Sequence, residues 1–348
     1  MKKIFKYFAA VIFTLTITQC NNPIEPPKPK IIKDPKDYTW TIDTLRYTSY
    51  DQTVMRSIWG DSPYNVYVVG HSSNANNGQT WHYDGKAWSP VPLPFTPSRE
   101  LDDIYGFSSK DVWAVGSEGQ NPYDARYDSS YVLHYDGSSW KVVDINGGKL
   151  LQSIWGTSST DIWAGGVNNL FHFDGTSWKK VISYDTSSNM QFVSIAGFSS
   201  NEVYFNKGDL TQYPYKLYNY LYFFNGQSIS IIDSTDNVAN ANLPKFGSRL
   251  RIIDGSLYSS SSGLFKRIGN NWNIILADTK IIAVNGTNSN HIFAAGLSAN
   301  IYYYDGSTWI NLTPIPGFNL PIYDIIVFDN EVFMVAHDGW TTYILHGK

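Results

Sequence analysis

Residues 153 to 181, SIWGTSSTDIWAGGVNNLFHFDGTSWKKV, display one complete unit of a repeat that runs through the chain. Ser153 to Trp155 and Asp161 to Ala164 are short β-branched and aromatic runs around a polar turn, which predicts two strands. Leu170 to Phe173 leads into Asp174-Gly175, a dipeptide that tolerates positive φ and closes a hairpin before Trp178. The unit therefore predicts four antiparallel strands.

The second strand of the unit carries a polar residue, an aliphatic residue and an aromatic residue, and this pattern occurs seven times. The spacing of the aromatic positions averages about 44 residues, the period of a propeller blade. Because one four-stranded sheet cannot cover both of its faces, copies must stack. We therefore expect an all-β fold, a seven-bladed β-propeller of four-stranded antiparallel blades. The seven aromatic positions are Tyr67, Trp113, Trp163, Tyr204, Tyr258, Phe293 and Phe333.

The last repeat ends at Tyr343 to Gly347, before the outer strand that the other repeats have. Upstream of the first repeat, Asp37 to Asp43 reads like such an outer strand. We predict that this N-terminal strand completes the seventh blade and closes the ring, which removes the exposed edges of an open sheet. The propeller domain is expected to span residues 37–348.

The N-terminal residues have the pattern of an export sequence. Three lysines precede an apolar run at residues 7–17, which is too short to span a bilayer comfortably, so residues 1–19 are predicted to be a signal peptide. Cys20 is the only cysteine, so no disulfide can form within the chain. The stretch 20–36 holds five prolines and is expected to be an extended tether.

Ile17-Thr18-Gln19-Cys20 resembles the lipobox of bacterial lipoproteins, with Gln19 in place of the usual small residue. The resemblance implies that Cys20 is lipidated and anchors the protein to a membrane of the bacterial cell envelope. Asn21, which is not Asp, implies the outer membrane, with the periplasmic and surface sides both open. A plain secreted protein and a retained membrane anchor are the alternatives.

Charge and motifs narrow the classes of function. Removing residues 1–19 takes away three lysines and no acids, which changes the formal net charge from −4 to −7 and makes nucleic acid an unexpected partner. The sequence has no HExxH, GxSxG, P-loop, GxGxxG or EF-hand motif. We therefore expect no cofactor and no metal, and favour a binding role over catalysis, although the sequence leaves an enzyme open.

Residue types that return once per blade favour structural roles. The tryptophans are expected to pack between neighbouring blades. Equivalent positions on different blades of a ring lie far apart and cannot share one metal ion. A repeated packing or hydrogen-bonding role is therefore expected for His82, His134, His172 and His346, and a turn role for Asp84, Asp136, Asp174 and Asp305.

The run Trp-Gly-x-Ser-Ser-x-Asp-Ile/Val-Trp-Ala-x-Gly occurs at residues 155–166 and, with Tyr105 leading, at 105–116. It resembles a propeller repeat of bacterial secreted proteins and lipoproteins, related in style to kelch, Asp-box and photosystem-assembly propellers. The resemblance covers residues 38–348 and implies the fold but no activity. The Asp-box match is imperfect, since Asp174 and Gly175 are adjacent and His172 stands at the Ser position.

The long connections are predicted to gather on one face. In a propeller, loops between second and third strands and between blades lie on the same face, and here these hold the insertions at 72–80, 117–130, 206–219, 90–101, 183–191, 234–247 and 313–321. Variable loops on a rigid scaffold commonly carry recognition. The candidate ligand-binding residues on this face are Tyr123, Asp124, Arg126, Tyr127, Tyr213, Tyr215 and Tyr218.

These features favour a monomeric, membrane-anchored extracytoplasmic binding or assembly module for a protein or glycan partner. One alternative is a glycoside hydrolase or lyase, which needs two facing carboxylates, for which Asp124 with Glu118 or Asp209 are the candidates. A second alternative is a purely structural component of the envelope.

Overall fold

The computed structural model describes residues 32–47, 51–73, 78–94, 99–118, 129–184, 190–209, 217–237, 244–312 and 315–348. The chain divides into two units, residues 1–32 and 33–348, and almost all described residues belong to the second. Within the described ranges, no helix has the length and apolar character needed to cross a membrane. Residues 1–31, which include the predicted signal peptide, Cys20 and most of the tether, lie outside the described residues.

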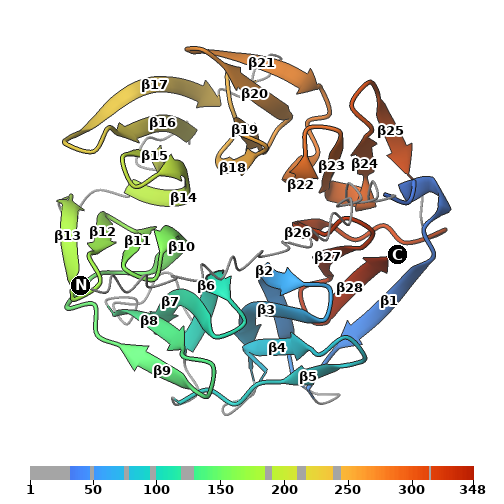
Figure 1. Cartoon of the computed structure of the whole chain (residues 1–348), viewed down its shortest axis with the longest axis horizontal. Coiled ribbons are helices and arrows are strands. Elements are labelled where there is room, and N and C mark those ends of the chain that lie inside the picture. Colours follow the sequence, from blue (N-terminus) through green and yellow to red (C-terminus); the bar gives the residue numbers. More distant parts are fainter. Residues whose placement is uncertain are drawn as a thin grey trace, which may run out of the picture. The chain divides into compact units, whose positions relative to one another are not determined.

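Seven four-stranded antiparallel sheets make up the second unit and follow one another around a ring (Figure 1). Each sheet is one blade, with its first strand innermost. Blade one contains β2 (Thr53–Ser62), β3 (Asn65–Ser72), β4 (Thr80–Tyr83) and β5 (Trp88–Pro90). Blade two contains β6 (Arg99–Ser108), β7 (Asp111–Glu118), β8 (Ser130–Tyr135) and β9 (Trp140–Val143). Blade three contains β10 (Leu151–Ser158), β11 (Asp161–Gly166), β12 (Asn169–Phe173) and β13 (Trp178–Ser183).

The next three blades continue the same order around the ring. Blade four contains β14 (Met190–Ser199), β15 (Glu202–Asp209), β16 (Leu217–Phe224) and β17 (Ile229–Asn237). Blade five contains β18 (Arg249–Ile253), β19 (Ser256–Ser260), β20 (Leu264–Ile268) and β21 (Asn271–Leu276). Blade six contains β22 (Ile281–Asn288), β23 (His291–Gly296), β24 (Ile301–Tyr304) and β25 (Trp309–Leu312). A short 3-10 turn, Leu297–Ala299, joins β23 to β24.

The seventh blade is built from both ends of the propeller. It contains β26 (Ile322–Val327), β27 (Val332–His337) and β28 (Thr342–Gly347), and its outer strand is β1 (Trp40–Leu45), which pairs antiparallel with β28. The predicted ring closure is thus confirmed. The strand begins at Trp40 and not at Asp37 because Pro35–Asp37 forms a 3-10 turn, capped by the side chain of Asp34.

The core lies between the blades, as seven clusters that each join two neighbours. The seven second-strand aromatics are all buried in these clusters or beside them. Trp178 of blade three, for example, meets Trp113 of blade two edge-on with ring centroids 6.4 Å apart. A buried tryptophan contributes about 4–6 kcal/mol of gross hydrophobic stabilisation as an upper bound. The expected packing role is confirmed for the tryptophans within the blade strands.

The four in-register histidines share one arrangement. The ring of His172 stacks on Trp163 at 4.3 Å, and its Nε2 lies 2.6 Å from a carboxylate oxygen of Asp161. Each histidine thus pairs with the polar residue, and stacks on the aromatic residue, of the second strand of its own blade. The matching pairs are His82 with Asn65 and Tyr67, His134 with Asp111 and Trp113, and His346 with Glu331 and Phe333.

The Asp-Gly turns are also structural. The carboxylate of Asp174 accepts hydrogen bonds from the backbone N–H groups of Thr176 and Ser177, while Gly175 adopts a φ of +87° that L side chains rarely take. A hydrogen bond from the side chain of Lys179, followed by those from the two backbone donors, holds the pKa of Asp174 well below its usual range. The turn geometry therefore explains why the dipeptide recurs.

The two faces of the ring differ in their connections. Six of the seven turns between first and second strands are two residues long, such as residues 159–160 between β10 and β11. We call this side the turn face. The long connections, such as 119–129 between β7 and β8, join second to third strands or one blade to the next, and we call their side the loop face.

Candidate functional site

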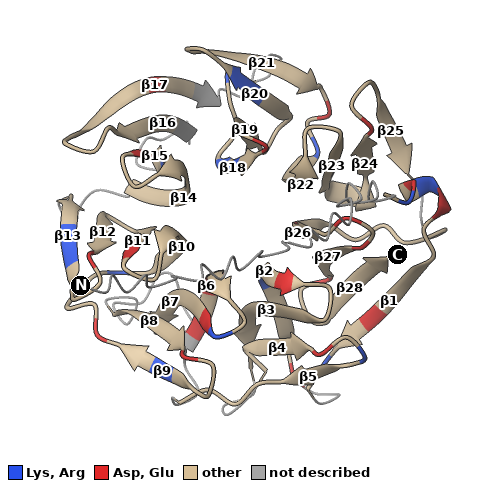
Figure 2. Ribbon diagram, in the orientation of Figure 1, with Lys and Arg blue, Asp and Glu red and all other residues tan. Residues whose placement is uncertain are grey.

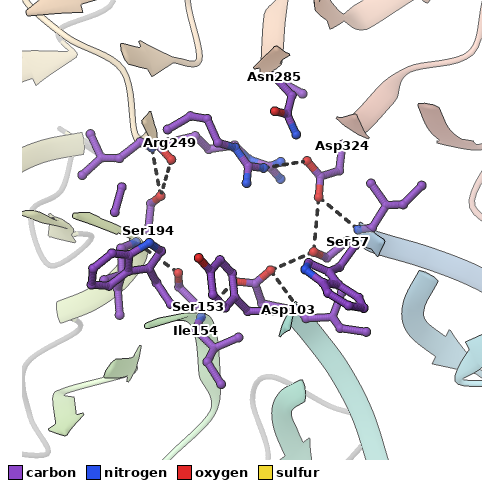
Figure 3. Close-up of a pocket in the computed structure, with 18 of the residues that line it drawn as sticks. Ser57, Asp103, Ser153, Ile154, Ser194, Arg249, Asn285 and Asp324 are labelled. Carbon is purple, nitrogen blue, oxygen red and sulfur yellow. Dashed lines mark hydrogen bonds and ion pairs between the residues drawn. The ribbon is translucent and has the colours of Figure 1, made fainter. Parts of the chain in front are cut away.

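A channel runs through the ring and is lined by the first strands of all seven blades. It encloses about 680 Å³, and Figure 3 shows labelled side chains from several blades converging on it. Charged positions are otherwise scattered among the described residues of the ring (Figure 2). The channel is therefore the place where groups far apart in the sequence meet.

Polar side chains in the channel wall tie the blades together. A serine or aspartate in one first strand accepts a hydrogen bond from a backbone N–H of the next blade's first strand, as seen for Asp103 and Ile154 in Figure 3. We call these residues the bridge ring. The contacts are Asp103 to Ile154 at 2.9 Å, Ser153 to Ile195 at 3.1 Å, Ser194 to Leu250 at 2.9 Å and Asp324 to Ile58 at 3.1 Å, and Ser57 completes the set by donating to Asp103 at 2.7 Å.

Two carboxylates of the bridge ring lie close together. The hydroxyl of Ser57 lies within hydrogen-bond distance of both Asp103 and Asp324, and Arg251 lies 3.4 Å from Asp324. Burial raises the pKa of Asp103 to about 6, and the negative charge of Asp324 adds to the shift. All four carboxylate oxygens already have partners in the protein, which assigns this pair to the closure of the ring.

A second hollow of about 420 Å³ opens where the first strands begin. Because the connections between blades arrive at that end, the hollow lies on the loop face. We call it the mouth hollow. Its lining consists of Val54, Arg56, Asp102, Gln152, Val193, Ser248, Arg249, Tyr323 and His337.

Arg56 is the centre of an ionic network beside the mouth hollow. Its Nη1 lies 2.7 Å from Asp102 and 3.0 Å from Glu100, and His71 Nδ1 lies 3.1 Å from the other oxygen of Glu100. Burial acts to raise the pKa of Glu100, but contact with His71 and the charge of Arg56 outweigh it and lower the pKa. The charge of Arg56 is thus already compensated within the protein.

The protonation states of two further groups follow from the same network. Burial raises the pKa of Asp102 to about 6; the charge of Arg56 opposes this shift, and the charges of Glu100 and Asp103 add to it. Burial and the nearby charge of Arg56 lower the pKa of His337 to about 4. At pH 7 the imidazole of His337 is therefore neutral, and it stacks on Tyr323 with ring centroids 4.0 Å apart.

Three lining residues of the mouth hollow carry buried polar atoms that no hydrogen bond satisfies within the described part of the chain. They are Oδ2 of Asp102, Oε1 of Gln152 and Nδ1 of His337, from three different blades. An unsatisfied buried polar atom costs about 1–3 kcal/mol. Other buried atoms without partners, such as Nε1 of Trp140 and of Trp178, lie in the packing between blades, whereas these three belong to residues that line one hollow, where a ligand can satisfy them.

Six of the seven candidate ligand-binding residues predicted from the sequence fall on parts that the structure leaves undescribed. Tyr123, Asp124, Arg126, Tyr127, Tyr213 and Tyr215 lie outside the described residues. Tyr218 lies on β16, where its backbone pairs with Asp209 and Asp236, and nothing is described of its side chain. These residues remain predictions. Among the described residues, no group of three or more histidine, cysteine or acidic side chains is arranged to hold a metal ion.

Sequence reasoning missed the channel residues. The bridge ring had a visible pattern, a serine or aspartate before Ile and an aromatic residue, as in Ser57-Ile58-Trp59 and Asp103-Ile104-Tyr105. The mouth hollow had a weaker signal. Asp102 and Gln152 stand at one repeated position, directly before the bridge residue of their strand, but the residue type at this position differs from blade to blade.

Comparison with known proteins gives the fold. The structure is similar to that of YCF48 bound to D1 peptide, with a TM-score of 0.60 and 13% identity, over 91% of this chain and 98% of that one. It is also similar to the extracellular domain of the putative one component system BT4673 from B. thetaiotaomicron, with a TM-score of 0.58 and 13% identity over 87% of this chain. This chain spans 39% of the length of that second protein.

A computationally designed protein, Ika8, is similar too, with a TM-score of 0.51 and 12% identity over 84% of this chain and 96% of its own. No protein-family model matches the sequence, and no curated protein matches it. At these identities the likenesses establish the fold alone. The chain is thus a seven-bladed β-propeller, and its function has to be inferred from its own residues.

Proposed function

We propose that this protein is a membrane-anchored extracytoplasmic binding or assembly module that recognises a protein or glycan partner through its loop face. The observation that carries the proposal is a coincidence of position. The face that holds the sequence insertions is also the face on which the mouth hollow opens, with its three unsatisfied polar atoms. Recognition on variable loops around a rigid pocket is a common arrangement.

The similar structures support a binding role without identifying a ligand. One of them is described with a bound peptide and another as the extracellular domain of a putative one component system. The N-terminal export pattern and the position of Cys20 support an anchored, extracytoplasmic location. A chain of this kind would present its loop face to a partner in the envelope or outside it.

The function is tested by a pull-down from envelope extract together with a glycan array, using the purified chain and a variant with Tyr123, Tyr127, Tyr213 and Tyr215 changed to alanine. Tyr64→Ala is the matched control, since Tyr64 is 67% exposed on the turn between β2 and β3. Binding that is lost in the fourfold variant and kept in the control would support the proposal. No binding by the wild-type chain would instead favour a purely structural role.

The anchor is tested separately with Cys20→Ser. Lipidation needs the thiol of Cys20, so this variant is expected to leave the membrane fraction and to fractionate without detergent. Wild-type protein should need detergent. Continued detergent dependence of the serine variant would contradict the lipid anchor.

A further inference from the structure

The mouth hollow has a chemical character that narrows the ligand class, on the assumption that the loop face binds a partner as proposed above. Seven of its nine lining residues have polar side chains, and only Val54 and Val193 are aliphatic. An apolar peptide side chain would find little matching surface there. Its volume of about 420 Å³ falls within the roughly 300–1,000 Å³ of ligand pockets.

The charges in the hollow are largely balanced before any ligand arrives. Arg56 contacts both Glu100 and Asp102, and the imidazole of His337 is neutral at pH 7. Arg249 donates to the carbonyl of Tyr323. A strongly charged ligand would therefore meet a compensated cluster, whereas an uncharged polar ligand would not have to displace an ion pair.

A ligand that can both donate and accept hydrogen bonds would satisfy these atoms. Oδ2 of Asp102 and Oε1 of Gln152 are acceptors, and Nδ1 of a neutral His337 is a donor or an acceptor according to its tautomer. The end torsions of carboxyl and amide side chains are broad, so these atoms can turn toward the hollow without moving the backbone. Hydroxyl groups supply both functions from one atom.

An exposed aromatic side chain stands on the same face. Trp340 is 59% exposed in the turn between β27 and β28, which follows His337 directly in the chain. Its carbonyl accepts a hydrogen bond of 2.7 Å from the backbone of Thr53, the neighbour of Val54 in the hollow's lining. Such a flat, electron-rich ring is suited to the C–H face of a sugar.

We propose that the mouth hollow is a subsite for an uncharged sugar residue, whose hydroxyl groups pair with Asp102, Gln152 and His337 while an adjoining sugar stacks on Trp340. The ligand would thus be a neutral oligosaccharide and not a protein. The three lining residues that carry unsatisfied polar atoms then each have a role in recognition.

The test is binding of the purified full chain to a printed array of neutral hexose and N-acetylhexosamine oligosaccharides, with uronic-acid and sialic-acid oligosaccharides as charged probes. Three variants remove one contact each. Gln152→Met removes the acceptor at similar length, His337→Phe keeps the stacking on Tyr323 but removes Nδ1, and Trp340→Ala removes the platform. Tyr64→Ala is again the control from the turn face.

The expected result is binding to neutral oligosaccharides that is weakened at least tenfold in each of the three variants and unchanged in the control. The Gln152→Met and His337→Phe proteins should melt at the same temperature as the wild type or higher, which a merely structural role would not produce.

Three other results would overturn the inference, and they separate it from the proposed function. Saccharide binding that survives these variants but is lost in the fourfold tyrosine variant would place the sugar elsewhere on the loop face. Capture of a protein partner through the tyrosines, without binding to the array, would support the proposed function and contradict the sugar subsite. Absence of both kinds of binding would contradict both proposals.

Discussion

The two ends of the channel are built differently, although first strands of the blades line both. At the turn face, aromatic side chains lie flat on glycines of the next blade. A Cβ placed on Gly106 would come within 2.5 Å of the Trp59 ring, and one on Gly197 within 2.5 Å of Trp155. At the loop face, the mouth hollow holds polar atoms without partners. The packing at the turn-face end thus stabilises the fold, while the unsatisfied polar atoms at the loop-face end lower its stability.

The repeat sequence explains this difference. The serine or aspartate of the bridge ring recurs in five of the seven blades, and an aromatic-Gly pair follows it in three, Trp59-Gly60, Tyr105-Gly106 and Trp155-Gly156, because these junctions between blades meet the same packing requirement. The position directly before the bridge residue, by contrast, changes in type from blade to blade and is held by Arg56, Asp102, Gln152, Val193 and Tyr323. Departure from the repeat, rather than the repeat itself, therefore marks the part of the molecule available for recognition.

Removal of the closing strand should have the largest effect, since both ends of the channel require a closed ring. Deleting Trp40–Leu45 would expose the edge of β28 and remove Leu45, which is 1% exposed, from the core between blades seven and one. We expect loss of cooperative unfolding or formation of oligomers, measured by urea denaturation and light scattering. A monomer with unchanged unfolding would contradict the closure.

A side chain at a turn-face glycine should come next. Gly106→Val would force the Trp59 ring away from its place on blade two, which we expect to lower the free energy of unfolding by about 1–3 kcal/mol. Ser109→Ala, in the exposed turn three residues later, is the control and should change it by less than about 0.5 kcal/mol. Equal effects of the two variants would mean that the aromatic-on-glycine contact does not stabilise this end.

The bridge ring should show a pH dependence with a defined sign. The pKa of Asp103 is raised to about 6 in the folded state, so its protonation favours folding, and this stabilisation is gained as the pH falls below about 6 and lost as it rises through that value. The Asp103→Asn variant lacks this carboxyl group, so it does not gain this stabilisation as the pH falls. The stability of the wild type relative to this variant should therefore increase as the pH falls from 7 to 5, by about 1 kcal/mol.

Asp305 provides the control for that pH series. It is an exposed turn residue whose pKa is lowered to about 2 by the backbone of Thr308 and by Ser307, so its stabilisation is present at both pH values and is lost only as the pH falls toward 2. Asp305→Asn should show no change in slope between pH 5 and pH 7. If the stability difference between the wild type and Asp103→Asn also stays constant between pH 5 and pH 7, the role assigned to the bridge ring is contradicted.

The smallest effects, of opposite sign, are expected from two neighbouring residues of β10. Ser153→Ala removes the acceptor of the Ile195 N–H and should destabilise the fold by about 1 kcal/mol. Gln152→Met removes an unsatisfied acceptor and should leave stability unchanged or raise it by about 1 kcal/mol. Urea unfolding of both variants measures this difference in the free energy of unfolding. If both variants are destabilised, the bridge ring and the mouth hollow do not differ in their contribution to stability.

The architecture could be predicted because it is periodic. Seven Tyr, Trp or Phe positions at a regular spacing, with Asp-Gly turns between them, specify blades that stack, and the missing outer strand of the last blade specifies the closure by β1. The roles of the in-register histidines followed from the same regularity. Local chemistry repeated along a chain can be interpreted without a structure, because each copy is a separate observation of one packing requirement.

The mouth hollow could not be predicted in this way. Asp102 and His337 meet only because the ring brings blades two and seven to one channel, and the lack of partners for Gln152 Oε1 is a property of three-dimensional packing. A sequence pattern indicates which face carries long loops. It does not indicate which non-repeated side chains of the first strands face each other across the channel.

The most direct test of the account is a paired measurement on wild-type protein and the Gln152→Met variant, combining urea unfolding with binding to the neutral oligosaccharide array. If the loop-face end of the channel gives up stability for recognition, the variant should be at least as stable as the wild type and should bind at least tenfold more weakly. A variant that is less stable and binds equally well would contradict the claim, because Gln152 would then belong to the structural framework.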